Sequence, residues 1–288
     1  GTIEGTATLI VDSAIDLTEH RADALKVELR VARVLQPRLD LVEAPASLKG
    51  SGTVKVHAND WIVVHGDNLL FGGLEGQTYA VLDGCYLPEG TSEPCTSPLG
   101  GAGQLVRGVE VPLRLPSSVD RRVGIFPFSP RIAGIRPGRF VGTVALKNQQ
   151  NILPAPSRSD PQPLVVTQVA PELTGISPPA ASIGQYVELK GAGFVGGQPG
   201  QATILRLLGQ FMLEGSPIAI PVDLEVVAEW VARYPDGPVG RYVLDETDAL
   251  GQALLPRGGL RQGAGTFTGT AALVLRDGKN SVVSQPDR

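Results

Sequence analysis

The sequence FGGLEGQ at Phe71–Gln77 returns as VGGQPGQ at Val195–Gln201, about 125 residues further along the chain. Each copy runs on through aliphatic residues to a Glu-Gly pair, at 89–90 in the first copy and at 214–215 in the second. A repeat at a fixed spacing sets the architecture of a chain, because each copy folds as one structural unit beside its neighbour. The sequence therefore predicts one kind of domain, present twice.

The repeat continues beyond these turns. Residues Val109–Leu115 resemble Ile218–Leu224, and Phe140–Leu146 resemble Phe267–Leu273. The spacing between matched residues falls from 125 (215 − 90) to 109 (220 − 111) and then rises to 127 (267 − 140). These changes predict 16 additional residues in the first copy (125 − 109) and 18 in the second (127 − 109). Insertions of this kind lie in surface loops, where the backbone remains hydrated.

Domain boundaries follow from the same comparison. The first copy is predicted over residues 36–170, with its insertion within Thr91–Gly108. The second copy is predicted over residues 171–288, with its insertion at 225–266.

The first 35 residues resemble the end of each copy. Gly5–Ile10 is similar to Gly142–Leu146 and Gly269–Leu273, and Leu25–Val31 alternates apolar and charged residues as a half-buried strand does. We therefore expect residues 1–35 to form the last two strands of a preceding copy. Two hypotheses explain this pattern: the chain is a fragment of a longer array of repeats, which we favour, or the hairpin completes a domain in a neighbouring chain.

Composition and local pattern indicate many short strands and turns, since the 288 residues include 36 Gly and 24 Pro and only one Met. Short β-rich segments separated by turn residues predict an all-β fold, with a sandwich of about seven strands in each copy. In the first copy the expected strands are Trp61–His65, Thr78–Leu82, Gly108–Leu115, Arg139–Lys147 and Pro163–Gln168.

One segment of the second copy has a helical pattern. Leu224, Val227 and Val231 share one stripe of a helix drawn over residues 224–234. The segment starts the predicted insertion, so we expect at most one short helix, capping one end of the sandwich.

The opening of the second copy resembles a known family. Pro171–Pro178 (PELTGISP) followed by Gly184–Phe194 (GQYVELKGAGF) is similar to the start of an IPT/TIG domain, which has a Pro-x-Ile-x-x-Ile-x-Pro strand and then a Gly-x-Gly-Phe turn. Gly191 and Gly193 would permit positive φ in that turn. The first copy keeps a weaker form of the strand at Leu39–Pro45. The resemblance implies tandem immunoglobulin-like sandwiches of a bacterial-type surface protein.

Charge and hydropathy exclude two classes of partner. The net charge of −4 is spread over both signs without a basic block, which argues against nucleic acid as a partner because phosphate binding needs clustered Lys and Arg. No apolar run reaches the roughly 20 residues that a membrane-spanning helix needs.

The two cysteines, Cys85 and Cys95, flank the start of the first insertion, and the second copy has Gly209 at the place of Cys85. Because the second copy lacks both the cysteine pair and the insertion, the sequence predicts that Cys85 and Cys95 form a disulfide. A disulfide favours an oxidising compartment. Two free thiols are the alternative.

No metal, cofactor or catalytic site is predicted. The glycines of the repeated turns, Gly72, Gly76, Gly196 and Gly200, lack the Lys-Ser/Thr pair and the following helix of a phosphate loop, so we interpret them as turn residues. The chain has three histidines, which we expect at the surface or at sheet edges and too scattered to share a metal ion, His20, His57 and His65.

Aromatic residues divide into two groups. Trp61 lies among Ile62, Val63 and Val64 and is expected in the core. Trp230 and Tyr234 fall in the predicted second insertion, where they either pack on their own sandwich, which we favour, or bind a protein or a sugar.

These observations predict a non-enzymatic, extracellular or cell-surface protein, with the periplasm as a further location. It would act through spacing and through contacts with other proteins or copies of itself, by head-to-tail contact or strand addition. The alternative hypothesis is an accessory module of a larger secreted enzyme that binds polysaccharide through its aromatic side chains.

Overall fold

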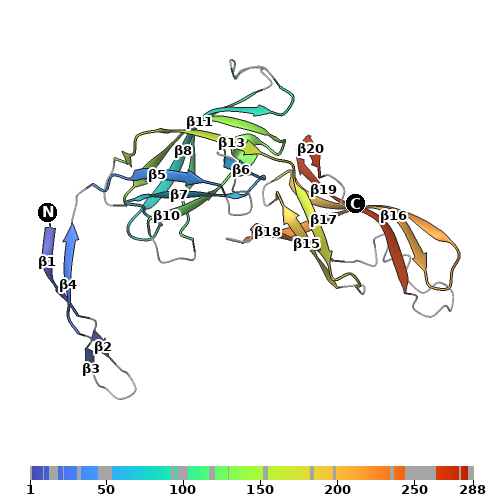
Figure 1. Ribbon diagram of the computed structural model, residues 1–288, viewed down its shortest axis with the longest axis horizontal. Helices are drawn as coiled ribbons and strands as arrows, with labels where there is room; N and C mark the ends of the chain where they lie inside the picture. The colour runs from blue at the N-terminus through green and yellow to red at the C-terminus, as the bar shows by residue number, and fades with distance from the viewer. Residues whose placement is uncertain are drawn as a thin grey trace.

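The computed structural model is an all-β protein, as the sequence predicts (Figure 1). Helical residues in the described part of the chain form one turn, α1 (Pro130–Ala133). The structure describes residues 2–8, 10–12, 19–21, 23–30, 34–44, 54–91, 95, 103–116, 121–128, 130–151, 155–181, 185–196, 199–233, 237–243, 264–278 and 280–284.

Two sheets form the part of the chain that we call repeat 1, residues 38–168. The smaller sheet has the order β10-β7-β5 and consists of β5 (Arg38–Glu43), β7 (Trp61–Asp67) and β10 (Val123–Pro127). The larger sheet has the order β6-β13-β11-β8-β9, with β12 beside β11. Its strands are β6 (Val54–Val56), β8 (Gln77–Pro88), β9 (Gln104–Pro112), β11 (Gly138–Gln149), β12 (Ser157–Arg158) and β13 (Gln162–Gln168).

One apolar core lies between the two sheets of repeat 1. Along β7, Ile62 and Val64 are fully buried while Val63 between them is partly exposed, because successive side chains of a strand point to opposite faces. Leu82 and Phe140 enter the same core from the larger sheet. Burying a large apolar side chain contributes about 1.5–3 kcal/mol relative to leaving it exposed, so this shared core holds the two sheets together.

The strands of repeat 2, residues 172–284, form a single sheet with the order β14-β15-β18-β17-β16-β19-β20. They are β14 (Glu172–Ser177), β15 (Tyr186–Ala192), β16 (Gln201–Leu213), β17 (Ala219–Arg233), β18 (Gly237–Val243), β19 (Gly265–Asp277) and β20 (Asn280–Val283). The long strand β17 joins the two halves of this sheet, since residues 219–228 pair with β16 and residues 229–233 pair with β18.

The strand order of repeat 2 matches that of repeat 1. The series β14-β15-β18 corresponds to β5-β7-β10, and β17-β16-β19-β20 corresponds to β9-β8-β11-β13. Registers agree as well: Gly84 faces Gly142 across β8 and β11, and Gly209 faces Gly269 across β16 and β19. The two repeats therefore share a pairing pattern and not only a sequence motif.

Strand pairing corrects the length of the first insertion. Val106 pairs with Gly84, and Val222 pairs with Gly209, which gives a spacing of 116 (222 − 106) at this point and not 109. A register shift between β8 and β9 then lowers the spacing to 115 (224 − 109), since Val109 pairs with Leu82 and Leu224 with Leu207. Relative to the spacing of 125 between the glycines (209 − 84), repeat 1 has nine additional residues before Val106 and not 16.

The second insertion is also displaced. Gly124 pairs with Val64, and Gly240 pairs with Leu189, which gives a spacing of 116 (240 − 124) at β10 and β18. The spacing reaches 127 (269 − 142) only at β11 and β19. The 11 extra residues of repeat 2 (127 − 116) therefore follow β18, and residues 225–243 include strands of the sheet, contrary to the predicted insertion at 225–266.

The predicted helix over residues 224–234 is wrong, because residues 224–233 belong to β17. Leu224 and Ala228 are buried and Val227 is 68% exposed, so the side chains alternate with the period of a strand. Leu224, Val227 and Val231 are spaced three and four residues apart, which fits a helical stripe, but the segment pairs with its neighbours as a strand and buries alternate side chains.

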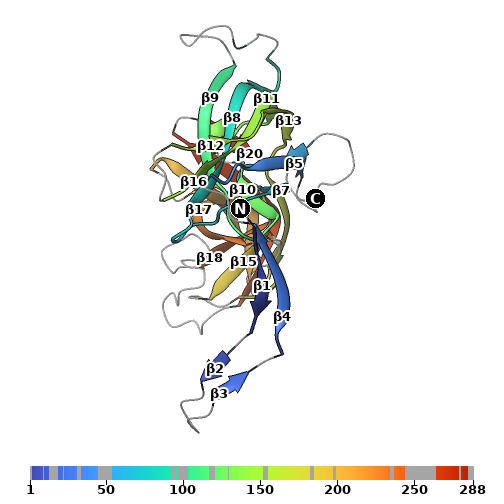
Figure 2. The same cartoon turned by 90° about the vertical axis from the view of Figure 1, so that its left-hand side faces the viewer.

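The N-terminal segment forms hairpins outside both repeats. β1 (Thr2–Ala7) pairs antiparallel with β4 (Leu25–Arg30), and β2 (Ile10–Asp12) pairs with β3 (Glu19–Arg21). Figure 1 shows these pairs at one end of the molecule, with repeat 1 between them and repeat 2, and Figure 2 shows them projecting away from the sheets of the repeats. Over the described residues, the structure has no helix suited to crossing a membrane.

Candidate functional site

Cys85 and Cys95 form a disulfide, with their Cα atoms 5.7 Å apart. Cys85 lies in β8, opposite Val141 of β11, and the bridge fixes the start of the first insertion to this strand. In repeat 2 the corresponding residue is Gln210, which faces Thr268, and not Gly209 as the sequence comparison indicates. A disulfide at this position fits an oxidising compartment.

The glycine-rich turn of repeat 1 leads from β7 in the smaller sheet to β8 in the larger sheet, and the turn of repeat 2 leads from β15 to β16 within one sheet. Gly72 and Gly76 have φ of 97° and 106°, a range that residues with a Cβ seldom adopt. At Gly76 a Cβ would also lie 2.1 Å from the Gln149 carbonyl oxygen, so only glycine fits the close approach of the two backbones. In repeat 2, Gly200 has φ of 82°, and Gly196 has φ of 159°, at the edge of the extended range.

The other two glycines from the sequence comparison, Gly191 and Gly193, lie at the end of β15. A Cβ on Gly191 would lie 2.1 Å from the Glu172 carbonyl oxygen, so the close pairing with β14 requires glycine. Gly193 has φ of 85° and lies against Pro171 and His57, which places this turn at the contact between the two repeats.

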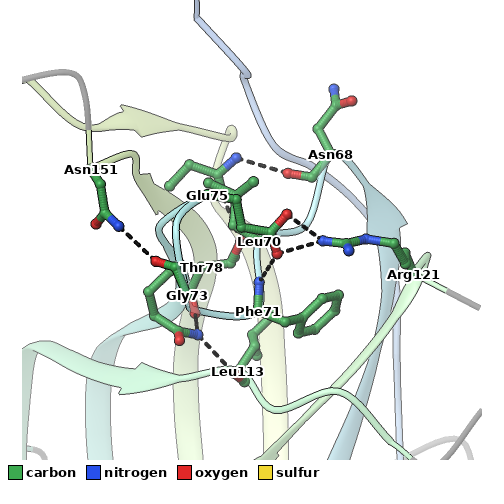
Figure 3. A network of polar contacts seen from close by, with 11 residues as sticks. Asn68, Leu70, Phe71, Gly73, Glu75, Thr78, Leu113, Arg121 and Asn151 are labelled. Atoms are coloured by element: carbon green, nitrogen blue, oxygen red, sulfur yellow. Dashed lines mark hydrogen bonds and ion pairs between the residues drawn. The ribbon is translucent and has the colours of Figure 1, made fainter. Parts of the chain in front are cut away.

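A polar network holds the turn of repeat 1 in one conformation (Figure 3). Arg121 donates to both carboxylate oxygens of Glu75, at 2.5 and 2.6 Å, and Glu75 Oε1 also accepts the backbone N–H of Phe71 at 2.9 Å. On the other side, the amide of Asn151 donates to the Gly73 carbonyl at 2.7 Å. The network leaves Leu74, at the tip, 96% exposed, so the turn presents an apolar side chain on a fixed backbone.

The segment 34–37, which leads from the N-terminal hairpin into repeat 1, is tied to repeat 1 by side-chain hydrogen bonds. The Leu35 carbonyl accepts from Asn148 Nδ2 at 2.9 Å and from Ser157 Oγ at 2.7 Å, and the Leu35 N–H donates to Gln150 Oε1 at 3.0 Å. The Gln36 carbonyl accepts from Asn68 at 2.8 Å. The connection therefore has defined partners on repeat 1.

The contact between repeats 1 and 2, which we call the junction, has an apolar centre. Ala58 and Ile135 from repeat 1 pack with Val195 and Leu275 from repeat 2 in one buried cluster, and Val282 lies against it. Each of the four central residues is at most 3% exposed. Burial of this kind fixes the position of one repeat against the other, because separating them would expose apolar surface to water.

Hydrogen bonds between described residues also cross the junction beside this cluster. Asn59 Nδ2 donates to the Phe194 carbonyl at 3.0 Å, and Arg136 donates to Asn280 Oδ1 at 3.1 Å. Asn59 has φ of 65°, a left-handed conformation that asparagine tolerates better than most residues. The junction could not be predicted from the sequence, because Ala58 and Ile135 are far apart in the chain. The Gly-x-Gly-Phe turn before Val195 is the part of this contact that the sequence analysis recognised as a motif.

His57 is buried at the junction, contrary to the expected surface position. Its backbone N–H donates to Asp60 Oδ2 at 2.7 Å, and its ring Nδ1 lies 3.0 Å from the same oxygen. His65 is half-buried on β7, where its Nε2 lies 3.1 Å from Glu43. His20 lies in the short strand β3.

Asp40 and Tyr86 both have pKa values shifted from those of the free side chains. The hydrogen bond from Arg38 Nε to Asp40, 2.7 Å long, holds the pKa of the exposed Asp40 carboxyl below its ordinary value. Burial raises the pKa of Tyr86 well above the ordinary value of a tyrosine, and the charge of Glu89 adds to the shift. The Tyr86 hydroxyl donates to the Arg136 carbonyl, so the core of repeat 1 holds the backbone that reaches the junction.

The structure places Trp61 where the sequence predicts it, but it does not place Trp230 in an insertion. Trp61 is buried in repeat 1, as expected, with the Arg114 guanidinium 5.5 Å from the centre of its ring. The backbone of Trp230 pairs with Gly240 between β17 and β18, so Trp230 lies in a strand of the sheet and not in an insertion. Tyr234 lies outside the described residues.

The remaining surface offers limited chemistry. A groove of about 440 Å³ is lined by Gln36–Leu39, Asn68, Ser159, Asp160 and Gln162, beside the segment that enters repeat 1. Within the described ranges, no group of three or more His, Cys, Asp or Glu side chains forms a metal site.

No family model matches the chain, and a search of curated proteins finds no relative.

Proposed function

We propose that this protein is a non-enzymatic, extracytoplasmic structural or adhesive protein, built from tandem immunoglobulin-like domains. It acts by holding its domains at a fixed spacing and by making contacts with other proteins or with copies of itself. The observation that carries the proposal is the junction, where Ala58, Ile135, Val195 and Leu275 form a buried apolar contact between two domains of one kind.

Several features support an immunoglobulin-like, IPT/TIG-like domain. In repeat 1 a three-stranded and a larger sheet share one core, and a short strand, β6, pairs parallel with the last strand, β13. A sandwich of about seven strands with mostly antiparallel pairing is typical of the immunoglobulin fold. The turn at Gly191 and Gly193, which carries the resemblance to the IPT/TIG family, lies at the domain contact.

The disulfide and the junction together support a role outside the cytoplasm as a spacer. A Cys85–Cys95 bridge persists in an oxidising compartment, where small domains use such bonds for stability. A buried contact between domains suits a chain that must keep its shape, because domains joined only by a linker move relative to each other.

Small-angle X-ray scattering of the oxidised chain tests the spacing role. A single arrangement of repeats 1 and 2 should fit the data, and Ala58→Asp should broaden the distribution of distances, because it buries an unpaired carboxylate in the junction. Ile218→Asp adds the same charge at an exposed position and serves as the control. If the wild-type data require freely moving repeats, the proposed function is wrong.

A further inference from the structure

The N-terminal hairpin has the register of the strand pair β11–β13 in repeat 1. Gly5 pairs with Val27 and Ile3 with Leu29 in the hairpin, as Gly142 pairs with Leu164 and Phe140 with Val166 in repeat 1. Phe140, Leu164 and Val166 are buried in the core of repeat 1. Ile3, Val27 and Leu29 therefore hold register positions that belong to the core of a complete domain.

In both complete repeats, the strand that corresponds to β1 has a partner on each side. β11 pairs with β13 on one side and with β8 on the other, and β19 pairs with β20 and with β16. Among the described strands, β1 pairs with β4 alone, and residues 4–8 are exposed. The edge of β1 that corresponds to the β8 side of β11 is thus open in the structure (Figure 1).

Glycine at position 5 has no role within the hairpin. A Cβ added to Gly5 would meet nothing within 4 Å. A Cβ on Gly142 would lie 2.2 Å from the Asp83 carbonyl oxygen, and one on Gly269 would lie 2.3 Å from the Leu208 carbonyl oxygen. In the complete repeats, the close approach of the neighbouring strand therefore requires glycine. Among the described strands, none takes that place beside β1.

The neighbouring strands share a recognisable pattern. β8 has Leu82, Gly84 and Tyr86 at alternate positions, and β16 has Leu207, Gly209 and Phe211. All four flanking side chains are buried, and the central glycine faces the glycine of the next strand. The pattern Leu-x-Gly-x-aromatic describes a strand with its apolar side chains in the core and room for a close backbone contact at its centre.

We propose that the open edge of β1 binds an extended polypeptide segment with the pattern Leu-x-Gly-x-aromatic, antiparallel, with the glycine of that segment opposite Gly5. Backbone hydrogen bonds along the edge give affinity, and the alternate Leu and aromatic side chains give specificity, as in other cases of strand addition. The inference rests on the proposed function, because it names the kind of partner that an assembly protein of this type recruits.

A labelled peptide with the sequence of Thr203–Leu213, flanked by lysines for solubility, tests this interaction on the full chain. Hydrogen exchange should slow at least tenfold at amides of Thr2–Ala7, and fluorescence anisotropy should report binding. Gly5→Val should weaken binding at least tenfold, because the added side chain blocks the close approach, while the exposed Thr6→Val should change it less than twofold. A peptide with Gly209→Val should bind at least tenfold more weakly.

Three results would overturn the inference. The first is that the peptide does not slow hydrogen exchange in β1. The others are that the Gly209→Val peptide binds as tightly as the original peptide, or that the Gly5→Val chain binds it as tightly as the wild-type chain. These failures would leave the proposed function standing if the wild-type chain still scatters as one rigid pair of repeats. A flexible junction together with peptide binding at β1 would refute the spacing role and keep the strand-binding edge.

Discussion

Thr78 and Thr203 have the same buried role in the two repeats. The hydroxyl of Thr78 accepts the backbone N–H of Leu70 at 2.6 Å, and the hydroxyl of Thr203 accepts that of Val195 at 2.7 Å, each eight residues earlier in the chain. Both threonines are fully buried. The two glycine-rich turns therefore match at a spacing of 125 (203 − 78), one residue more than the 124 (201 − 77) that their sequence motifs indicate.

Replacing either threonine with valine should destabilise its repeat by about 1–3 kcal/mol, because a buried N–H loses its acceptor while the side-chain shape is kept. Urea unfolding of Thr78→Val and Thr203→Val measures this cost. Thr78→Ser retains the hydroxyl and should recover most of the loss. A cost for Thr78→Val no larger than that of the exposed Thr6→Val would contradict the assigned role.

Junction variants should uncouple the unfolding of the two repeats. Leu275→Ala removes a fully buried side chain of the junction and should cost about 2–5 kcal/mol. Ala58→Asp should separate one calorimetric transition into two, since each repeat has its own core and loses the support of its neighbour. A single unchanged transition in Ala58→Asp, like that of Ile218→Asp, would show that the junction carries no coupling.

The disulfide should stabilise repeat 1 alone. Closing the short loop between Cys85 and Cys95 is worth roughly 3 kcal/mol in the chain-entropy account. Reductant should lower the Tm of the wild-type chain to that of a double variant, Cys85→Ser with Cys95→Ser, and should not alter the variant. If the wild-type chain keeps its Tm in reductant while its thiols become reactive, the bond has no stabilising role.

Tyr86 should make the protein less stable in alkaline solution. Its pKa is raised in the folded state, so the stabilisation is complete below the unfolded pKa of about 10 and falls as the pH rises above that value, where only the unfolded chain ionises. Urea unfolding at pH 8 and pH 11 should show a smaller loss for Tyr86→Phe than for wild type. Tyr86→Phe should also cost about 1 kcal/mol at pH 8, through the lost hydrogen bond to Arg136. Equal losses between pH 8 and pH 11 would refute the burial effect.

The sequence predicted the all-β class of fold, because short segments rich in β-branched and aromatic residues and bounded by turn residues, such as Trp61–His65, are typical of strands. It failed over β17, where Leu224, Val227 and Val231 also fit a helical spacing. It also paired Val111-Pro112 with Ile220-Pro221, although Val111 faces Ala80 and Ile220 faces Phe211. A shared dipeptide carries no information on register, which the partner strand determines.

The candidate site was the least predictable part. Disulfide formation followed from two cysteines near one insertion, whereas the junction depends on small and aliphatic residues without a motif of their own, such as Ala58 and Ile135. Their role depends on which domain ends meet, and that information is in the tertiary structure.

Sedimentation velocity of the oxidised full chain, over a hundredfold range of concentration, tests the central claim most directly. A protein that acts through contacts with copies of itself should show a sedimentation coefficient that rises with concentration, and Gly5→Val should reduce the rise if strand addition at β1 contributes. A monomer at every concentration would contradict the assembly role.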